Sequence, residues 1–154
     1  MTFEVIDWLR ACPEDRPRDP TQPALDRTED ETMTDFTQLA QHYVEAWNET
    51  DATARREAVQ RLWAPTGRYV DPVVDVQGHE QIAAAIGAVQ EQFPGMVFEL
   101  LGEVDSHHAQ ARFQWGLGPA GREPLVVGFD VVEVGQDGRV ASVLGFLDRV
   151  PAQV

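Results

Sequence analysis

The chain has 154 residues, a length typical of one domain with a sizeable core. Its net charge of −14 makes nucleic acid and anionic membrane surfaces poor partners. The single cysteine, Cys12, excludes an internal disulfide and a cysteine-rich metal site, and no apolar run approaches the roughly 20 residues of a membrane span. We expect a cytoplasmic protein, because residues 1–10 do not resemble a signal peptide.

Residues 1–32 differ in composition from the rest of the chain. Four of the ten prolines lie between residues 10 and 32, among many charges, so we expect a flexible leader there. Residues 3–9 have the spacing of one short amphipathic turn, which is either a frayed tail or a partner-binding motif. Met33 is itself a plausible start codon. The composition therefore predicts a dispensable leader over 1–32 and one domain over 33–154.

Three amphipathic helices are expected in the first half of this domain. The first begins at Asp35, whose spacing from Gln38 resembles a capping box, and its apolar residues recur on one face. The second runs over about 52–63 and is ended by a proline and a glycine, after which residues 68–72 predict a short strand closed by a turn. The third follows Gly78 and stops before a Pro-Gly pair.

The second half of the domain predicts an antiparallel meander. Alternating apolar residues and intervening turn signals place its strands at about 96–105, 109–117, 125–134 and 139–147. Helices that come first and antiparallel strands that follow favour an α+β fold, with the helices gathered on one side of the sheet.

One carboxylate, Asp130, lies in the middle of the most apolar of these strands. The period-2 alternation of a strand places it on one face together with Val126, Gly128 and Val132. A carboxyl group in such surroundings must be paired, solvated by a pocket or kept protonated. We interpret Asp130 as a pocket-lining acid; the alternative is an aspartate bound to an arginine or a backbone amide.

Four motifs in this order resemble the nuclear transport factor 2-like superfamily, and within it ketosteroid isomerase and the SnoaL-like group. They are Y-V-E-A-W-N-x-x-D, Y-V-D-P, G-H-E-Q-I-A-A-A-I and G-F-D-V-V-E-V-x-x-D-G-R-V, within residues 35–150. The resemblance implies a cone: a curved antiparallel or mixed sheet wrapped around three N-terminal helices, with an apolar pocket at the wide end. It also implies a homodimer formed through the sheet.

The resemblance also implies three catalytic residues, each matched by position. Tyr43 matches the tyrosine that donates to a developing oxyanion, and Asp71, before a proline, matches the general base. Asp130 matches an aspartic acid that stays protonated and donates to the same oxygen, so that the surroundings of the two carboxyl groups hold them in opposite states. From the residues alone, Tyr43 is equally well a packed aromatic and Asp71 equally well a turn cap.

Seven aromatic residues are expected to form the apolar walls for a flat or cyclic ligand: Trp47, Trp63, Tyr69, Phe93, Phe98, Trp115 and Phe146. The alternative is that most of them are simply core. We expect no cofactor and no metal, because the histidines lack partners at ligand spacing. His79 is expected near the pocket mouth, and His107 and His108 at a hairpin tip.

The predicted function is that of a cofactor-independent acid/base enzyme acting on a small apolar or cyclic ketone-type substrate. The chemistry is either proton transfer of the ketosteroid isomerase type or a SnoaL-like cyclisation. Epoxide hydrolases of this fold use an Asp–Arg–Asp set, but the strand parity of Arg112 directs it away from the apolar side. The alternative is a non-catalytic ligand-binding or dimerisation module. Convergence of Tyr43, Asp71 and Asp130 on an open cavity would favour the enzyme.

Overall fold

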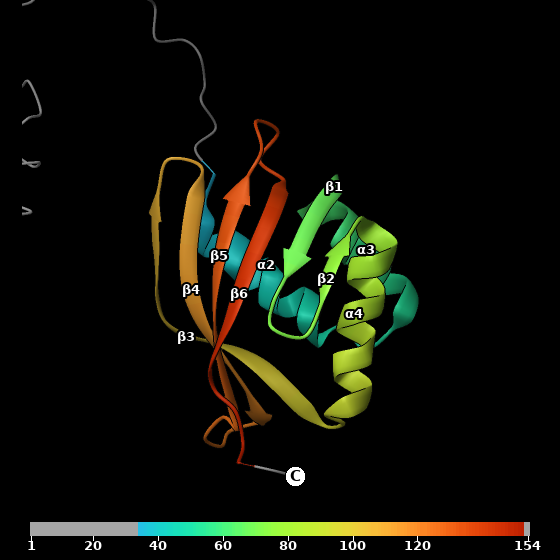
Figure 1. The fold of residues 1–154 in the computed structure, drawn as a ribbon, viewed down its shortest axis with the longest axis vertical. Coiled ribbons are helices and arrows are strands. Elements are labelled where there is room, and N and C mark those ends of the chain that lie inside the picture. Colours follow the sequence, from blue (N-terminus) through green and yellow to red (C-terminus); the bar gives the residue numbers. More distant parts are fainter. Residues whose placement is uncertain (1–33, 153–154) are drawn as a thin grey trace, which may run out of the picture. The chain divides into compact units, whose positions relative to one another are not determined.

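The computed structural model describes residues 34–152, which form an α+β fold (Figure 1). The leader expected over 1–32, with its turn at 3–9, lies outside the described residues. The described elements are α2 (Phe36–Asn48), α3 (Ala52–Leu62), β1 (Trp63–Val70), β2 (Asp75–Gln77), α4 (His79–Gln92), β3 (Met96–His107), β4 (Gln110–Pro119), β5 (Val126–Val134) and β6 (Val140–Arg149). No helix within 34–152 is long and apolar enough to cross a membrane.

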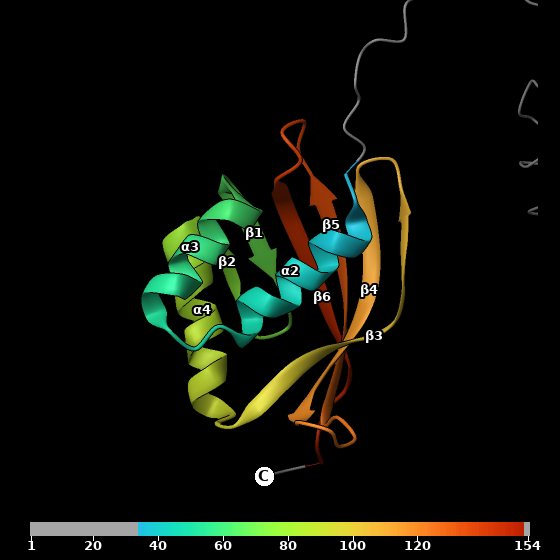
Figure 2. The ribbon, with the colours of Figure 1, turned by 180° about the vertical axis from the view of Figure 1, so that it is seen from behind.

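The six strands form one mixed sheet in the order β2-β1-β6-β5-β4-β3. The last four are successive antiparallel neighbours, as the expected meander requires. β1 joins the sheet beside β6 in the parallel direction, and the short β2 pairs with β1 at the edge. The strands curve, and Figures 1 and 2 show the same sheet from its two sides, with α2 lying across one of them.

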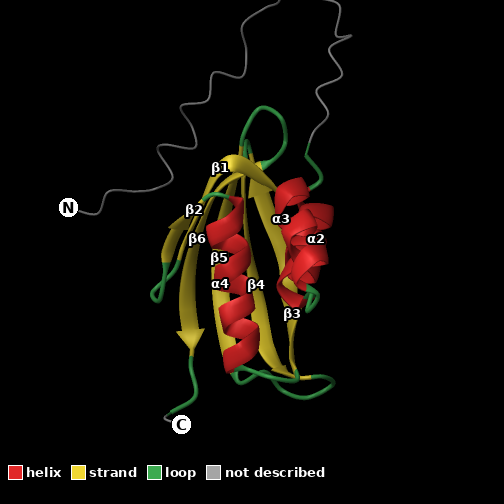
Figure 3. Cartoon of the chain, turned by 90° about the vertical axis from the view of Figure 1, so that its right-hand side faces the viewer, coloured by secondary structure: helices red, strands yellow, loops and turns green. Residues whose placement is uncertain are grey.

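Local sequence signals explain where the helices begin. The carboxylate of Asp35 accepts a hydrogen bond from the Gln38 backbone N–H at 3.0 Å, and the carboxylate of Asp51 accepts one from the Ala54 backbone N–H at 2.8 Å. Both are N-caps that satisfy an otherwise free amide of the first turn. The helices gather on one face of the sheet, as predicted (Figure 3).

The region after α3 differs from the prediction. β1 begins at Trp63 rather than at Arg68, so Pro65 and Gly67 lie inside a strand instead of ending a helix. The pairing of β1 with β6 shifts register between Trp63 and Arg68, and an irregular stretch of this kind tolerates a proline and a glycine. The three-residue β2 was not predicted, because so short a segment has no readable alternation.

The two faces of β5 follow the predicted alternation. Val126, Gly128, Asp130 and Val132 are buried beneath the helices. The residues between them are half-buried and lie on the outer face of the sheet. Next to them on that face are two exposed apolar side chains of β6, Leu144 with 44% and Phe146 with 56% of its surface accessible.

Side-chain hydrogen bonds fasten the end of α2 to β3. The Asn48 amide Nδ2 donates to the Phe98 carbonyl at 2.9 Å, and the Phe98 backbone N–H donates to Asn48 Oδ1 at 2.7 Å. The amide of Gln90 donates to the carbonyl oxygens of Trp47 and Glu49, which ties the same helix end to α4. These contacts hold the end of α2, which carries Trp47, against β3 and α4.

Candidate functional site

Tyr43 and Asp130 meet inside the domain, although 87 positions separate them in the chain. The Tyr43 hydroxyl donates to Asp130 Oδ2 at 2.6 Å. Tyr43 faces inward because it lies on the apolar stripe of α2, and Asp130 does so because of the alternation in β5. Asp130 is 1% exposed, and it is the one charged residue among the buried side chains of residues 34–152.

The environment of Asp130 favours its protonated form. Burial raises its pKa from 3.8 to about 6; the hydrogen bond from Tyr43 and then the Trp115 indole act in the opposite direction, and the charge of Asp71 adds to the rise. Burial, followed by the neighbouring Asp130, raises the pKa of Tyr43 well above its ordinary value, so that hydroxyl stays a donor. Asp130 Oδ1 is buried and has no hydrogen-bond partner among the described residues.

Asp71 caps a turn, which is one of the two roles that the sequence left open. Its Oδ1 accepts the backbone N–H groups of Val73 at 2.7 Å and Val74 at 2.8 Å, so the carboxylate organises the turn between β1 and β2. Its Oδ2 accepts the Tyr69 hydroxyl at 2.8 Å. The pKa of Tyr69 is strongly raised, first by burial and then by the charge of Asp130.

Gly145 lies between the two carboxyl groups. A Cβ atom at this position would lie 2.9 Å from Asp130 Oδ1 and 3.2 Å from the Asp71 Cβ. Only glycine therefore allows both aspartates to occupy their positions. Gly128 has a similar role, because a Cβ atom there would lie 2.0 Å from Cζ2 of the Trp115 ring, which covers it from the neighbouring strand.

Tyr43, Asp71 and Asp130 lie at the wall of an open cavity of about 350 Å³ between the sheet and the helices. Its volume is within the range of small-molecule sites, and apart from the acids, two tyrosines and one glutamine its lining is apolar. The lining consists of Tyr43, Val44, Trp47, Tyr69, Asp71, Val73, Val74, Ala85, Ala88, Val89, Gln92, Phe93, Phe98, Trp115, Leu117, Val126, Asp130, Leu147, Val150 and Pro151.

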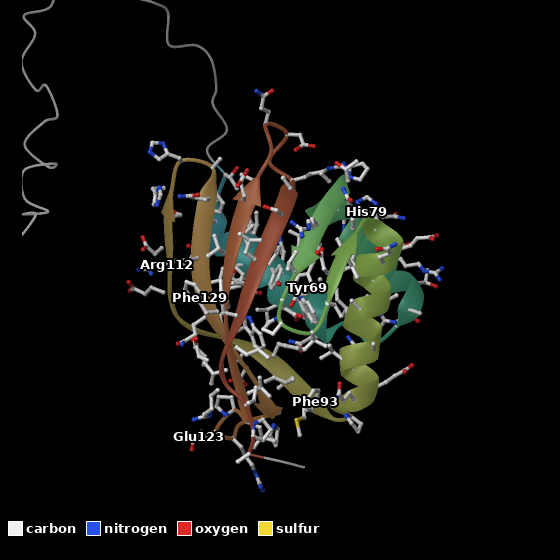
Figure 4. All side chains as sticks on the ribbon, in the orientation of Figure 1. Tyr69, His79, Phe93, Arg112, Glu123 and Phe129 are labelled. Atoms are coloured by element: carbon white, nitrogen blue, oxygen red, sulfur yellow. The ribbon has the colours of Figure 1, made fainter. Side chains whose placement is uncertain are left out.

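The structure brings together most, but not all, of the residues that the sequence assigned to a site. Tyr43, Asp71 and Asp130 all line the cavity, and so do five of the seven aromatic residues: Trp47, Tyr69, Phe93, Phe98 and Trp115. Figure 4 shows Tyr69 and Phe93 on the side of the sheet near α4, apart from Arg112 at the β3–β4 edge. Arg112 pairs there with Asp105 at 3.0 Å, outside the pocket as its parity predicted.

Two of the expected wall residues lie elsewhere. Trp63 starts β1 and is completely buried, with its ring 5.5 Å from that of Tyr43, so it supports the site from the core. Phe146 follows Gly145 in β6, and alternation places it on the outer face, where its ring lies 6.3 Å from that of Phe129. Neither residue belongs to the lining of the cavity, in contrast to the expectation from the sequence.

Several contributors to the site were not singled out from the sequence. Gly128 and Gly145 carried a readable signal, because a single glycine inside a strand often marks a close approach. The valines of the β1–β2 turn and Gln92 at the end of α4 carried none, since nothing in their local pattern indicates a cavity. Sequence spacing also did not reveal the hydrogen bond between Tyr69 and Asp71.

The histidines remain outside this arrangement. Nε2 of His79 lies 2.8 Å from the Trp63 carbonyl oxygen, which fixes the ring at the start of α4. His42, His107 and His108 are exposed. Within residues 34–152, no group of three histidine, cysteine or acidic side chains has the geometry to hold a metal ion.

Comparison with known proteins places this chain in a family. A family model described as a SnoaL-like domain matches residues 40–143. A crystal structure described as a putative isomerase of the SnoaL-like family, from Agrobacterium tumefaciens, is 42% identical with a TM-score of 0.71, over 75% of this chain and 99% of that one. None of the curated proteins matches the chain significantly.

More distant structures share the fold. A protein from Sinorhizobium meliloti described as a putative polyketide cyclase is 21% identical, with a TM-score of 0.56 over 70% of this chain and 93% of that one. A nuclear transport factor 2-like protein of unknown function from Cytophaga hutchinsonii is 12% identical, with a TM-score of 0.54 over 77% and 94% of the two chains. At these identities the likeness concerns the fold alone.

Proposed function

This chain belongs to the SnoaL-like domain family, and from that premise we propose that it is an enzyme that moves a proton on a small apolar or cyclic carbonyl compound without a cofactor. The observation that supports the proposal most is the contact between Tyr43 and Asp130 at the wall of an apolar cavity. A buried acid with a raised pKa, held by a tyrosine at the wall of a cavity, is what proton transfer requires.

We assign the proton-transferring role to Asp130. Its Oδ1 has no partner, and its pKa of about 6 suits a group that takes a proton from carbon and returns it to another atom. Both oxygens of Asp71 already accept hydrogen bonds, from two backbone amides and from Tyr69. This proposal differs from the roles that the resemblance implied, in which Asp71 was the base and Asp130 a donor.

In this proposal Tyr43 orients the Asp130 carboxyl group, and Asp71 helps to raise its pKa. The Tyr43 hydroxyl holds Oδ2, which leaves Oδ1 as the oxygen without a hydrogen bond. The charge of Asp71 contributes to the raised pKa of Asp130. Charge that develops on the substrate oxygen needs a hydrogen-bond donor, and we assign this role to the indole N–H of Trp47 in the cavity lining.

The names of the neighbours agree with this chemistry. The 42% identical neighbour is described as a putative isomerase, and a more distant one as a putative polyketide cyclase. Double-bond isomerisation and aldol-type ring closure both begin with removal of a proton next to a carbonyl group, and both end with its return. One carboxyl group that alternates between its two states serves either reaction.

The proposal is tested by hydrogen exchange on carbon. A panel of cyclic ketones is incubated in D₂O with the protein, and the loss of the α-proton signals is followed by NMR. We expect exchange with the wild type, a loss of at least a hundredfold in Asp130→Asn, and a smaller loss in Tyr43→Phe. Glu133→Gln is the matched control, because it removes one exposed carboxylate from the same strand. Equal exchange in Asp130→Asn and Glu133→Gln would refute the assignment.

We also propose that two copies associate through the outer face of the sheet. Leu144 and Phe146 expose large apolar surfaces there, and Phe129 lies beside Phe146. Monomeric proteins seldom leave neighbouring large apolar side chains uncovered on one sheet. A second copy would cover this patch while leaving the cavity on the opposite face accessible.

A further inference from the structure

We propose that the natural ligand of this cavity carries a positive charge, as a protonated amine, next to the group on which the chemistry takes place. This inference rests on the proposed function for its site, and it names the class of substrate. It is carried by three features of the cavity: its unbalanced acidic groups, the free oxygen of Asp130 and the surrounding aromatic rings.

The first feature is the charge of the lining. Asp71 and Asp130 both line the cavity, whereas none of the residues that line it is an arginine, lysine or histidine. The arginines that form ion pairs within 34–152 do so at the surface: Arg68 with Asp75, Arg112 with Asp105 and Arg149 with Glu123. An anionic ligand would therefore meet two carboxyl groups and no countercharge, which a specific site avoids.

The second feature is that Asp130 Oδ1 lacks a hydrogen-bond donor. Asp130 Oδ1 is buried and unpartnered, while Oδ2 already accepts from Tyr43. A buried acceptor without a hydrogen bond is costly, and a buried carboxylate without a cation more so. A ligand ammonium beside the Asp130 carboxyl group would supply the opposite charge that the cavity lining lacks.

The third feature is the wall itself. The rings of Trp47, Tyr69, Phe98 and Trp115 line the cavity as a connected cluster. The ring centroid of Trp47 lies 5.3 Å from those of both Tyr69 and Phe98, and those of Phe98 and Trp115 are also 5.3 Å apart. A cation within about 6 Å of an aromatic centroid is attracted by the ring, most strongly where water is excluded. Aromatic walls and carboxylates together are the usual surroundings of an organic cation.

A charged substrate also suits the proposed chemistry. When Asp130 takes the proton, the C–H electron pair becomes a C=C bond and the carbonyl π electrons move to oxygen. With an uncharged ketone the negative charge thus passes from Asp130, which becomes neutral, to an enolate oxygen in a cavity that also holds Asp71. With an ammonium group on the substrate the enolate is a zwitterion, and its negative charge is offset within the molecule.

The experiment compares three ligands of one shape. Binding of 1-naphthylmethylamine, 1-naphthalenemethanol and 1-naphthoate to the whole chain is measured by isothermal titration calorimetry at pH 8. We expect the amine to bind at least fivefold more tightly than the alcohol, and the carboxylate to bind most weakly. A ratio below fivefold between amine and alcohol, carboxylate binding as tight as that of the amine, or no binding by any of the three would overturn the inference.

Two variants localise the effect. Asp130→Asn should reduce the preference for amine over alcohol to less than twofold, whereas Glu133→Gln, which changes the net charge equally, should preserve it. If both variants keep the preference, the charge of Asp130 does not select the ligand. The ranking by the wild type stands on its own if Asp130→Asn does not fold. The expected ranking without any carbon exchange would refute the proposed function alone, and exchange with the opposite ranking would refute this inference alone.

Discussion

Replacing Asp130 by asparagine should remove a loss of stability that the wild type undergoes between about pH 4 and pH 6. Burial raises the pKa of this carboxyl group from 3.8 to about 6 in the folded protein. Between about pH 4 and pH 6 the folded state therefore binds more protons than the unfolded state. Stability falls as pH rises through this window, because the folded protein must ionise a group that its surroundings keep neutral.

The size of the effect follows from the two pKa values. The difference between 3.8 and about 6 corresponds to a free energy of about 3 kcal/mol. This penalty is fully developed above about pH 6 and absent below about pH 4. Asparagine has nearly the same shape, its carbonyl oxygen can still accept from Tyr43, and it does not titrate. The stability of Asp130→Asn relative to the wild type should thus be about 3 kcal/mol higher at pH 8 than at pH 4.

Urea unfolding followed by tryptophan fluorescence measures this quantity. Wild type, Asp130→Asn and Glu133→Gln are unfolded at intervals from pH 4 to pH 8. The difference in the free energy of unfolding between wild type and Asp130→Asn should grow through pH 5 and level off above pH 6. Glu133 is exposed, so its variant reports the background dependence of one surface carboxylate. Parallel stability curves for wild type and Asp130→Asn would refute the reasoning, since they would mean that the pKa of Asp130 is the same in both states.

Three further changes test other parts of the structure. Asn48→Ala removes both hydrogen bonds with the Phe98 backbone and should lower the free energy of unfolding by about 2 kcal/mol in urea titrations; an unchanged midpoint would contradict the contact. Gly145→Ala places a Cβ 2.9 Å from Asp130 Oδ1, so we expect at least a tenfold loss of carbon exchange with an unaltered circular dichroism spectrum, and full activity would show that the carboxyl group tolerates the displacement. Phe146→Glu places a charge on the exposed apolar face and should convert a dimer to a monomer in sedimentation velocity, whereas a species of unchanged mass would remove that face from the interface.

Local rules predicted the three helices and the four-stranded meander, but not β2 or the start of β1, and the pairing of Tyr43 with Asp130 came from the family resemblance. The spacing of Asp35 and Gln38 predicted the start of α2, and the apolar stripe behind it predicted that Tyr43 faces inward. Alternation along β5 predicted that Asp130 shares a face with Val126, Gly128 and Val132, and the structure buries that face. Helical and strand periods determine which face a residue occupies, so two residues far apart in the chain could be assigned to the same interior.

Position along an irregular strand could not be predicted in the same way. Phe146 was expected in the pocket because it is large and apolar, but its neighbour Gly145 occupies the inward position in β6. Trp63 was expected at a helix end, whereas a register shift in β1 places it in the core. The bond between Tyr69 and Asp71 depends on the turn that Asp71 itself forms, and no spacing rule contains that geometry.

The amide of Asn48 has a consequence for the behaviour of this chain in a crowded solution. β3 is the last strand of the sheet, and such a strand offers free amide and carbonyl groups to any extended segment of another molecule. At Phe98 both groups are already taken by one side chain from α2. An asparagine thus satisfies both groups at that point as a neighbouring strand would, and it withdraws them from the pairing that strand-by-strand aggregation needs.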